Sequence, residues 1–263
     1  MGDGELDFFG ISHFNLAFGQ KGMKDKGYGE VSLRNKFFPT ILFVFLTVLS
    51  FLIACRQLGD LDIWWHLAAG RWMWDNKSFI SHDPFSFTFY GQTWTSITWG
   101  FELIMYLSYL LADSSFWMIS IVHALFAAFS IGFAWFTFQE LRANRSILGW
   151  FIGFVTFVIA IWFLQLRWNH RPEVMTYLFA SAMFYFLVRA WKRASLGKQD
   201  RWIYLCLLIQ LAWSNSHGLF AFGPFLIATF FVSDLVERRR IPSQFSVVFG
   251  LSLLVCLINP EGI

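Results

Sequence analysis

Acids, histidines and arginines gather in four short clusters that interrupt a largely apolar chain, at residues 60–66, 167–172, 215–218 and 259–262. Carboxylates and imidazoles transfer protons or bind metal ions, and arginine binds phosphate through a planar fork of donors. These residue types predict a polar site whose members come from distant parts of the sequence.

The first cluster carries two acids, Asp60 and Asp62, followed by His66. Two carboxylates and an imidazole suit a general base or a divalent cation, although their spacing is not a metal-binding signature. A divalent cation is therefore a candidate cofactor, and no metal ligand is assigned. Asp62 could instead cap a short helix, because carboxylates stabilise the free amides of a helix start. We expect one catalytic base and one orienting acid, since the backbone does not turn both side chains the same way.

The second cluster places Arg167, His170 and Arg171 on a tight connection between two apolar runs. Arginines outside the cytoplasm run against the usual charge bias of membrane proteins, so they indicate an anionic partner. One candidate is the phosphate of a lipid-linked substrate, which arginine binds through two parallel hydrogen bonds. The other is a salt bridge to one of three carboxylates, Asp60, Asp62 or Glu173.

The third cluster ends in His217-Gly218, which predicts a tight turn between two helices. His217 is either a plain turn residue or a member of a polar cavity shared with His66 and His170. His123, inside an apolar run, is interpreted as a hydrogen-bonded packing residue.

Two further acids are interpreted as turn formers. Asp83 precedes a proline, and Glu261 follows Asn-Pro near the end of the sequence. Both contexts favour turns over catalytic positions.

The composition predicts an integral membrane protein. The chain is 57% hydrophobic, contains 34 Phe and 14 Trp, and is only 14% charged, where an ordinary soluble domain would have about a quarter. The net charge of +3 gives no reason to expect a nucleic-acid partner. The three cysteines, Cys55, Cys206 and Cys256, are interpreted as small hydrophobic residues without a disulfide.

The basic loops define the expected orientation, because Lys and Arg concentrate on the cytoplasmic side. The segment 1–36 is expected in the cytoplasm, and residues 37–263 form the membrane domain with a large outer loop at about 56–115. The apolar run 99–111 is short and contains Glu102, so we expect it to lie in the membrane interface. About seven spans then place every basic loop inside and all four polar clusters outside. Their expected ranges are 39–55, 116–138, 147–166, 173–190, 202–214, 219–236 and 244–258.

The motif Asp-x-Asp-x-Trp-Trp-His-Leu-x-x-Gly-Arg, beginning at Asp60, resembles bacterial multi-span proteins related to GT-C glycosyltransferases. Asp83-Pro-Phe-Ser-Phe-Thr, the segment 94–102, Arg171-Pro172 and the clusters at 215–218 and 259–262 extend the resemblance from about residue 40 onward.

This resemblance implies an all-α membrane fold with interfacial helices in the first outer loop and a catalytic acid there, at Asp60 or Asp62. It also implies a polyprenyl-phosphate-linked sugar as donor. Arg167, His170 and Arg171 match the basic residues that hold the lipid phosphate by their placement. GT-C enzymes usually have more spans than this chain, so the sequence is expected to be either part of a longer protein or a shortened member of the group.

Two functions from different classes follow. The first is sugar transfer from a polyprenyl-phosphate donor at the outer face of the bacterial inner membrane, with Asp60 and Asp62 as catalytic acids and His66, Arg167, His170, Arg171 and His217 binding the lipid phosphate or acceptor. The alternative is a non-enzymatic membrane subunit that uses the same scaffold to bind lipids or a larger complex. A transporter is disfavoured because few ionisable residues lie within the spans.

Overall fold

The computed structural model describes residues 28–142, 146–239 and 243–262. The chain divides into two compact units, residues 1–38 and 39–263, and the second unit contains the helix bundle. Most of the expected cytoplasmic segment 1–36 lies outside the described residues, as do Arg145 and Arg240 of the basic loops.

The described chain is all-helical, and its only β feature is an isolated bridge between His82 and Thr93. The helices in chain order are α1 (Tyr28–Ala54), α2 (Asp62–Asn76), α3 (Trp99–Leu111), α4 (Trp117–Leu141), α5 (Ile147–Leu164), α6 (Glu173–Ser195), the 3₁₀ helix η1 (Arg201–Tyr204), α7 (Leu205–Ser214), the 3₁₀ helix η2 (Gly218–Ala221), α8 (Phe222–Arg238) and α9 (Ser243–Val255).

Five described segments are long and apolar enough to cross a membrane: residues 37–54 of α1, then α4, α5, α6 and the segment Gly218–Arg238. Two of the seven expected spans, 202–214 and 244–258, form shorter helices, η1 with α7 and then α9. The run at Trp99–Leu111 is also a short helix, the length expected of an interfacial segment.

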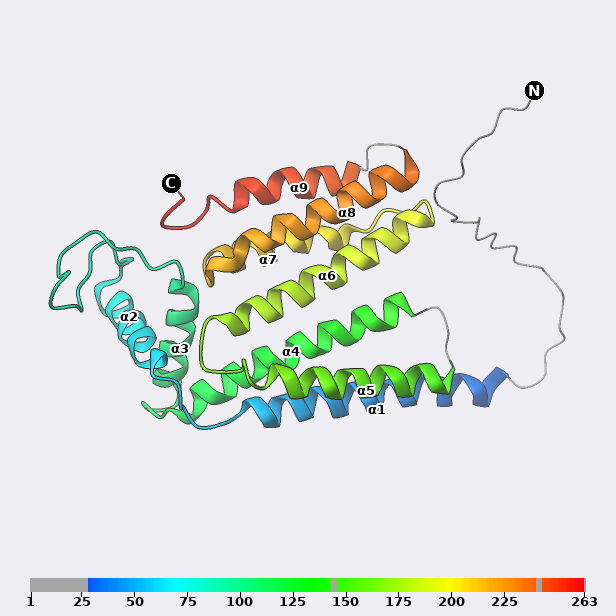
Figure 1. The fold of residues 1–263 in the computed structure, drawn as a ribbon, viewed down its shortest axis with the longest axis horizontal. Helices are drawn as coiled ribbons and strands as arrows, with labels where there is room; N and C mark the ends of the chain where they lie inside the picture. Colours follow the sequence, from blue (N-terminus) through cyan, green and yellow to red (C-terminus); the bar gives the residue numbers. More distant parts are fainter. Residues whose placement is uncertain (1–27, 143–145, 240–242, 263) are drawn as a thin grey trace, which may run out of the picture. The chain divides into compact units, whose positions relative to one another are not determined.

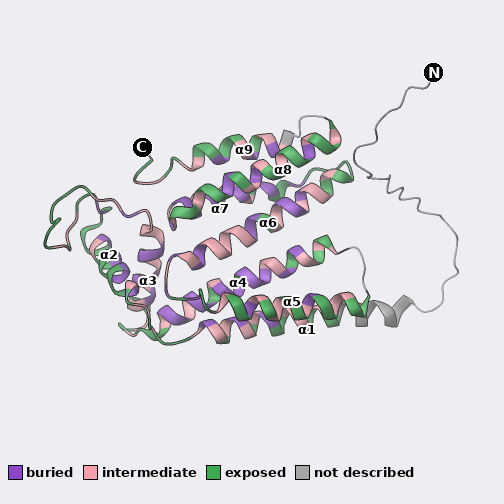
Figure 2. Cartoon of the chain, in the orientation of Figure 1, coloured by how far each residue is buried: buried purple, intermediate pink, exposed green. Residues whose placement is uncertain are grey.

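The outer surface of the bundle is apolar. Helix α5 has a mean hydropathy of 2.4, yet only 11% of it is buried within the protein. Exposed residues run along the length of α5 (Figure 2). Large side chains such as Phe151, Trp162 and Phe163 expose more than half of their surface. A surface of this kind is stable in hydrocarbon and costly in water, so the chain is an all-α membrane protein.

The long helices of the second unit run side by side, and α2 and α3 pack together across one end of them (Figure 1). Pairs α4 with α6, α6 with α8, and α8 with α9 are in contact, and α3 contacts the start of the bundle through α4. One end of the bundle therefore carries α2, α3 and the turns at 165–172, 215–218 and 256–262, and we call it the polar end.

Hydrogen bonds join these segments at the polar end. The indole nitrogen of Trp99 donates to the Asn215 side-chain oxygen at 2.8 Å, and the Asn215 side-chain nitrogen donates to the Ile258 carbonyl at 2.8 Å. Asn215 thus links α3, α7 and the turn after α9. All four clusters of the sequence lie at this end.

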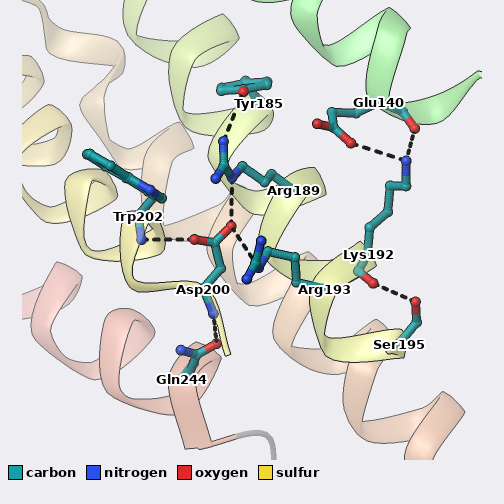
Figure 3. A network of polar contacts seen from close by, with 9 residues as sticks. All are labelled: Glu140, Tyr185, Arg189, Lys192, Arg193, Ser195, Asp200, Trp202 and Gln244. Atoms are coloured by element: carbon teal, nitrogen blue, oxygen red, sulfur yellow. Dashed lines mark hydrogen bonds and ion pairs between the residues drawn. The ribbon is translucent and has the colours of Figure 1, made fainter. Parts of the chain in front are cut away.

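The opposite end of the bundle is held by a buried carboxylate (Figure 3). Asp200, 3% exposed, accepts a hydrogen bond from Arg189 Nε at 2.8 Å and one from the Trp202 amide at 3.1 Å. Its own amide donates to Gln244 at 3.2 Å. These contacts connect α6, η1 and α9, and Lys192 of α6 binds Glu140 of α4 nearby. The described basic loops share this end.

Candidate functional site

Arg171 binds both acids of the first cluster. Its Nε lies 2.6 Å from Asp60 Oδ2, and its Nη2 lies 3.3 Å from Asp60 Oδ1 and 2.9 Å from Asp62 Oδ2. The guanidinium therefore forms a two-pronged pair with Asp60 and a further pair with Asp62. We call these three side chains the acid–arginine cluster. The salt-bridge interpretation of Arg171 is confirmed.

The start of α2 fixes the different settings of the two acids. The Asp62 amide donates to Asp60 Oδ1 at 3.0 Å, so the Asp60 side chain serves the helix start. Asp62 lies in the first turn of α2, where the helix dipole favours an acid, but the helix has no side-chain capping hydrogen bond. The Asp60 side chain is only 8% exposed, whereas that of Asp62 is 46% exposed. The hydrogen bond from Arg171 holds the pKa of Asp60 below its ordinary value. Asp60 is thus the enclosed, weakly basic acid, and Asp62 is the accessible one.

The turn that carries Arg171 is tied to the end of α1 by Arg56. Its Nη2 donates to the carbonyl oxygens of Gln165 and Trp168, each at 2.7 Å. Arg167 on the same turn is 68% exposed and lies 3.9 Å from a Glu173 carboxylate oxygen. Arg56 had no place in the sequence analysis, because its partners are main-chain groups more than 100 residues away.

His170 is buried behind this turn. Its Nε2 lies 3.3 Å from the Ser120 hydroxyl, and its ring centre is 4.7 Å from that of His123. Burial, reinforced by the positive charge of Arg56, lowers the pKa of His170 to about 4. The imidazole is therefore neutral near pH 7, and it would bind a phosphate as a hydrogen-bonding group without a charge.

His123 in α4 is fully buried against His170. Neither of its ring nitrogens makes a hydrogen bond within the described part of the chain. The interpretation of His123 as a packing residue is confirmed.

His66 turns away from the acid–arginine cluster into the packing between α2 and α3. Its Nδ1 lies 3.3 Å from Glu102 Oε1, and the same oxygen accepts hydrogen bonds from Ser96 and Thr98 at 2.8 Å each. Glu102 is fully buried and its second carboxylate oxygen has no partner among the described residues. Glu102 was expected only as a polar residue of an interfacial helix, because its pairing with His66 depends on tertiary contact.

His66 consequently does not join Asp60 and Asp62 as a third metal ligand. In the described ranges, no group of three or more His, Cys, Asp or Glu residues is arranged to hold a metal ion. Arg171 supplies a positive charge beside both acids.

His217 occupies a turn, as one of its two interpretations predicted. It precedes η2, where its Nδ1 accepts from the Leu219 amide at 3.4 Å, and the same nitrogen lies 2.8 Å from the Thr176 hydroxyl. Burial lowers the pKa of His217. Because His66, His170 and His217 each have a different partner, the contacts do not gather them into one cavity.

The remaining two acids are turn residues, as expected. The Asp83 carboxylate accepts from the amides of Phe85 and Ser86 at 2.8 and 3.0 Å. The Glu261 amide donates to the Asn259 side chain at 2.9 Å, which closes the last turn described.

A pocket of about 640 Å³ opens beside Arg56 at the polar end. Its lining includes Arg56, Leu58, Trp64, Phe116, Trp117 and Ser120. The pocket is mainly aromatic and aliphatic, with Arg56 as the cation and Ser120 connecting it to His170.

Comparisons of the chain with protein-family models, curated proteins and solved structures found no match.

Proposed function

We propose that this chain is a GT-C-like glycosyltransferase that moves a sugar from a polyprenyl-phosphate donor at the extracytoplasmic face of the bacterial inner membrane. The observation that carries the proposal is the acid–arginine cluster, in which a half-exposed carboxylate, Asp62, stands beside an enclosed one, Asp60, and a guanidinium. Two acids in different surroundings are what a base and its orienting partner require.

The orientation is part of the proposal. Taking η1 with α7 and α9 as two additional crossings gives seven spans, with α2 and α3 in the outer interface. The described basic residues at the end opposite the acid–arginine cluster then face the cytoplasm, as the distribution of Lys and Arg favours. The amino terminus would share that side.

In the proposed reaction, Asp62 accepts the proton of the acceptor hydroxyl as its oxygen attacks C1 of the sugar. The bond between C1 and the phosphate oxygen breaks, and its electrons leave with the polyprenyl phosphate. Arg171 would hold Asp62 in place, and Arg171 and the exposed Arg167 would offset the negative charge of the leaving phosphate. The neutral His170 would keep the turn that carries both arginines packed against α4.

The alternative is a membrane subunit without catalytic activity. It is favoured by one specific observation, since Arg171 already satisfies both Asp60 and Asp62 without a substrate. Partly exposed ion pairs of this kind also occur as purely structural contacts.

Substitutions on α2 separate the two functions. D62N removes the proposed base, and D75N is the matched control, because Asp75 is an exposed acid on the same helix that pairs with Arg71 at 3.4 Å. Both variants would be reconstituted with a panel of radiolabelled polyprenyl-phosphate sugars and a membrane extract as acceptor.

We expect D62N to slow transfer by about 100-fold or more, the usual contribution of a general base, while D75N stays close to wild type. A rate of transfer in D62N equal to that of the wild type would remove Asp62 from the mechanism. Absence of transfer by the wild type, together with recovery in a larger complex at fixed stoichiometry, would favour the subunit.

A further inference from the structure

Arg56 carries a charge that no acid of the described chain neutralises. None of the ion pairs among the described residues includes it. Its two hydrogen bonds both come from Nη2 and both go to main-chain carbonyls. A guanidinium has five N–H donors, so this geometry leaves donors directed elsewhere and a full positive charge.

The pocket beside Arg56 has the lining of an amphiphile site. Arg56 is the one charged residue among those that line it, and Ser120 is its buried hydroxyl. Trp64 and Phe116 meet edge to face, with ring centres 5.2 Å apart, and Trp117 extends the aromatic wall. A ligand for this pocket therefore needs one anionic group and an apolar body.

The level of the pocket in the fold points to a membrane lipid as that ligand. The pocket lies at the ends of two membrane-length helices, just after the last residue of α1, Ala54, and at the first residue of α4, Trp117. Trp64 and Trp117 are about half exposed there, at 46% and 55%. Exposed tryptophans at the ends of spans mark the headgroup level of a bilayer. Asp60, Asp62 and Arg171 do not line the pocket, so it is a separate site from the acid–arginine cluster.

We infer that this pocket binds a bilayer phospholipid, with the phosphodiester on Arg56 and the glycerol and upper acyl chains against Trp64, Phe116 and Trp117. The bound lipid also acts on the turn at 165–172. Arg56 is bonded to Gln165 and Trp168, so a phosphate that fixes its guanidinium fixes the turn that presents Arg171. The inference does not depend on sugar transfer.

The test is lipid retention measured by native mass spectrometry of the full chain released from detergent. Phosphatidylglycerol and phosphatidylethanolamine are the phospholipid probes, and diacylglycerol tests whether the phosphate is recognised. Polyprenyl phosphate is added as a competitor. The variants are R56Q, R56K and I121W, the last of which fills the pocket without changing Arg56, and R71Q is the control because Arg71 is an exposed arginine of α2 outside the pocket.

We expect one phospholipid bound to wild type and to R71Q. Retention should fall about tenfold or more in R56Q, which loses a charge-assisted contact, and in I121W, which fills the space for the lipid. R56K should retain part of the binding because it keeps the charge. D62N should retain the lipid fully even where it loses transfer, so the two proposals fail independently.

Three results would overturn the inference. The first is retention of the phospholipid by both R56Q and I121W at the level of the wild type. The second is retention of diacylglycerol equal to that of the phospholipids, which would mean that the phosphate is not recognised. The third is replacement of the phospholipid by polyprenyl phosphate one for one at lower concentration, which would assign the pocket to the donor.

Discussion

Replacing Gly70 with alanine tests the packing that places the start of α2. Gly70 is buried where α2 meets α3. A Cβ added there would lie 2.8 Å from Tyr106 Cβ and 2.9 Å from the Glu102 carbonyl carbon, and closer still to the carbonyl oxygen. Ordinary contacts begin at 3.4 Å, so α2 must withdraw by about 0.6 Å even to accommodate Tyr106. The obstacle is largely backbone, which a side-chain rotation cannot remove.

The expected cost follows from two opposing terms. Overpacking of a tight contact costs about 1–3 kcal/mol, and alanine recovers up to about 1 kcal/mol through its helix propensity. We expect G70A to lose about 1–2 kcal/mol, which corresponds to a Tm lower by about 2–8 °C for a chain of this size. The proposed sugar transfer should fall as well, because the movement of α2 also displaces Asp62.

The control for this substitution is Gly250 in α9, where an added Cβ meets nothing within 4 Å. G250A should be neutral or slightly stabilising, since only the propensity term applies. Thermal unfolding of both variants in the same nanodiscs gives the comparison. Equal Tm values for G70A, G250A and wild type would refute the close packing of α2 on α3.

Three further outcomes are expected. In a double-mutant cycle, D60N and R171M should show a coupling of about 1 kcal/mol at pH 7, and no coupling would make the pair irrelevant to stability. E102A should lower the free energy of unfolding by about 1–3 kcal/mol more than E102Q does, because alanine leaves buried donors without an acceptor. Equal losses for the two variants in denaturant melts would contradict the role of Glu102 as the acceptor of these hydrogen bonds. The pKa of His170 is lowered from 6.5 to about 4 in the folded chain. As the pH falls, the unfolded state therefore binds this proton first, and the free energy of unfolding should decrease between pH 6.5 and about 4, by at most about 1.4 kcal/mol per pH unit. H170N should reduce the dependence of the free energy of unfolding on pH in melts at pH 4 to 7. An unchanged dependence would mean that His170 is not the group responsible.

The sequence predicted the long helices and the gathering of the polar clusters for a physical reason. Apolar runs such as 117–141 and 147–164 are long enough to be recognised without tertiary information. Alternating crossings then place every second connection at the same end. The contact of Arg171 with Asp60 and Asp62 is a specific case of that rule.

Other parts of the site could not be predicted in this way. The partners of Arg56 are carbonyl oxygens, which every residue carries, so no sequence pattern marks them. The pair of Glu102 with His66 depends on how α3 packs on α2, a contact made possible by Gly70. The segments 202–214 and 244–258 were expected as spans, but their helices, α7 and α9, are shorter than the length that identifies a span from composition.

Labelling from outside the membrane tests the central claim most directly, namely that the polar end of the bundle faces away from the cytoplasm. The three native cysteines are first removed, and a single cysteine is then introduced in each of two variants. One variant carries it at Phe87, which is fully exposed in the loop between α2 and α3, and the other at the exposed Lys198 near the opposite end. A membrane-impermeant maleimide is then applied to right-side-out spheroplasts before and after permeabilisation. Labelling at position 87 before permeabilisation, and at position 198 only afterwards, is the predicted result. The reverse pattern would place the acid–arginine cluster in the cytoplasm and contradict the proposed orientation.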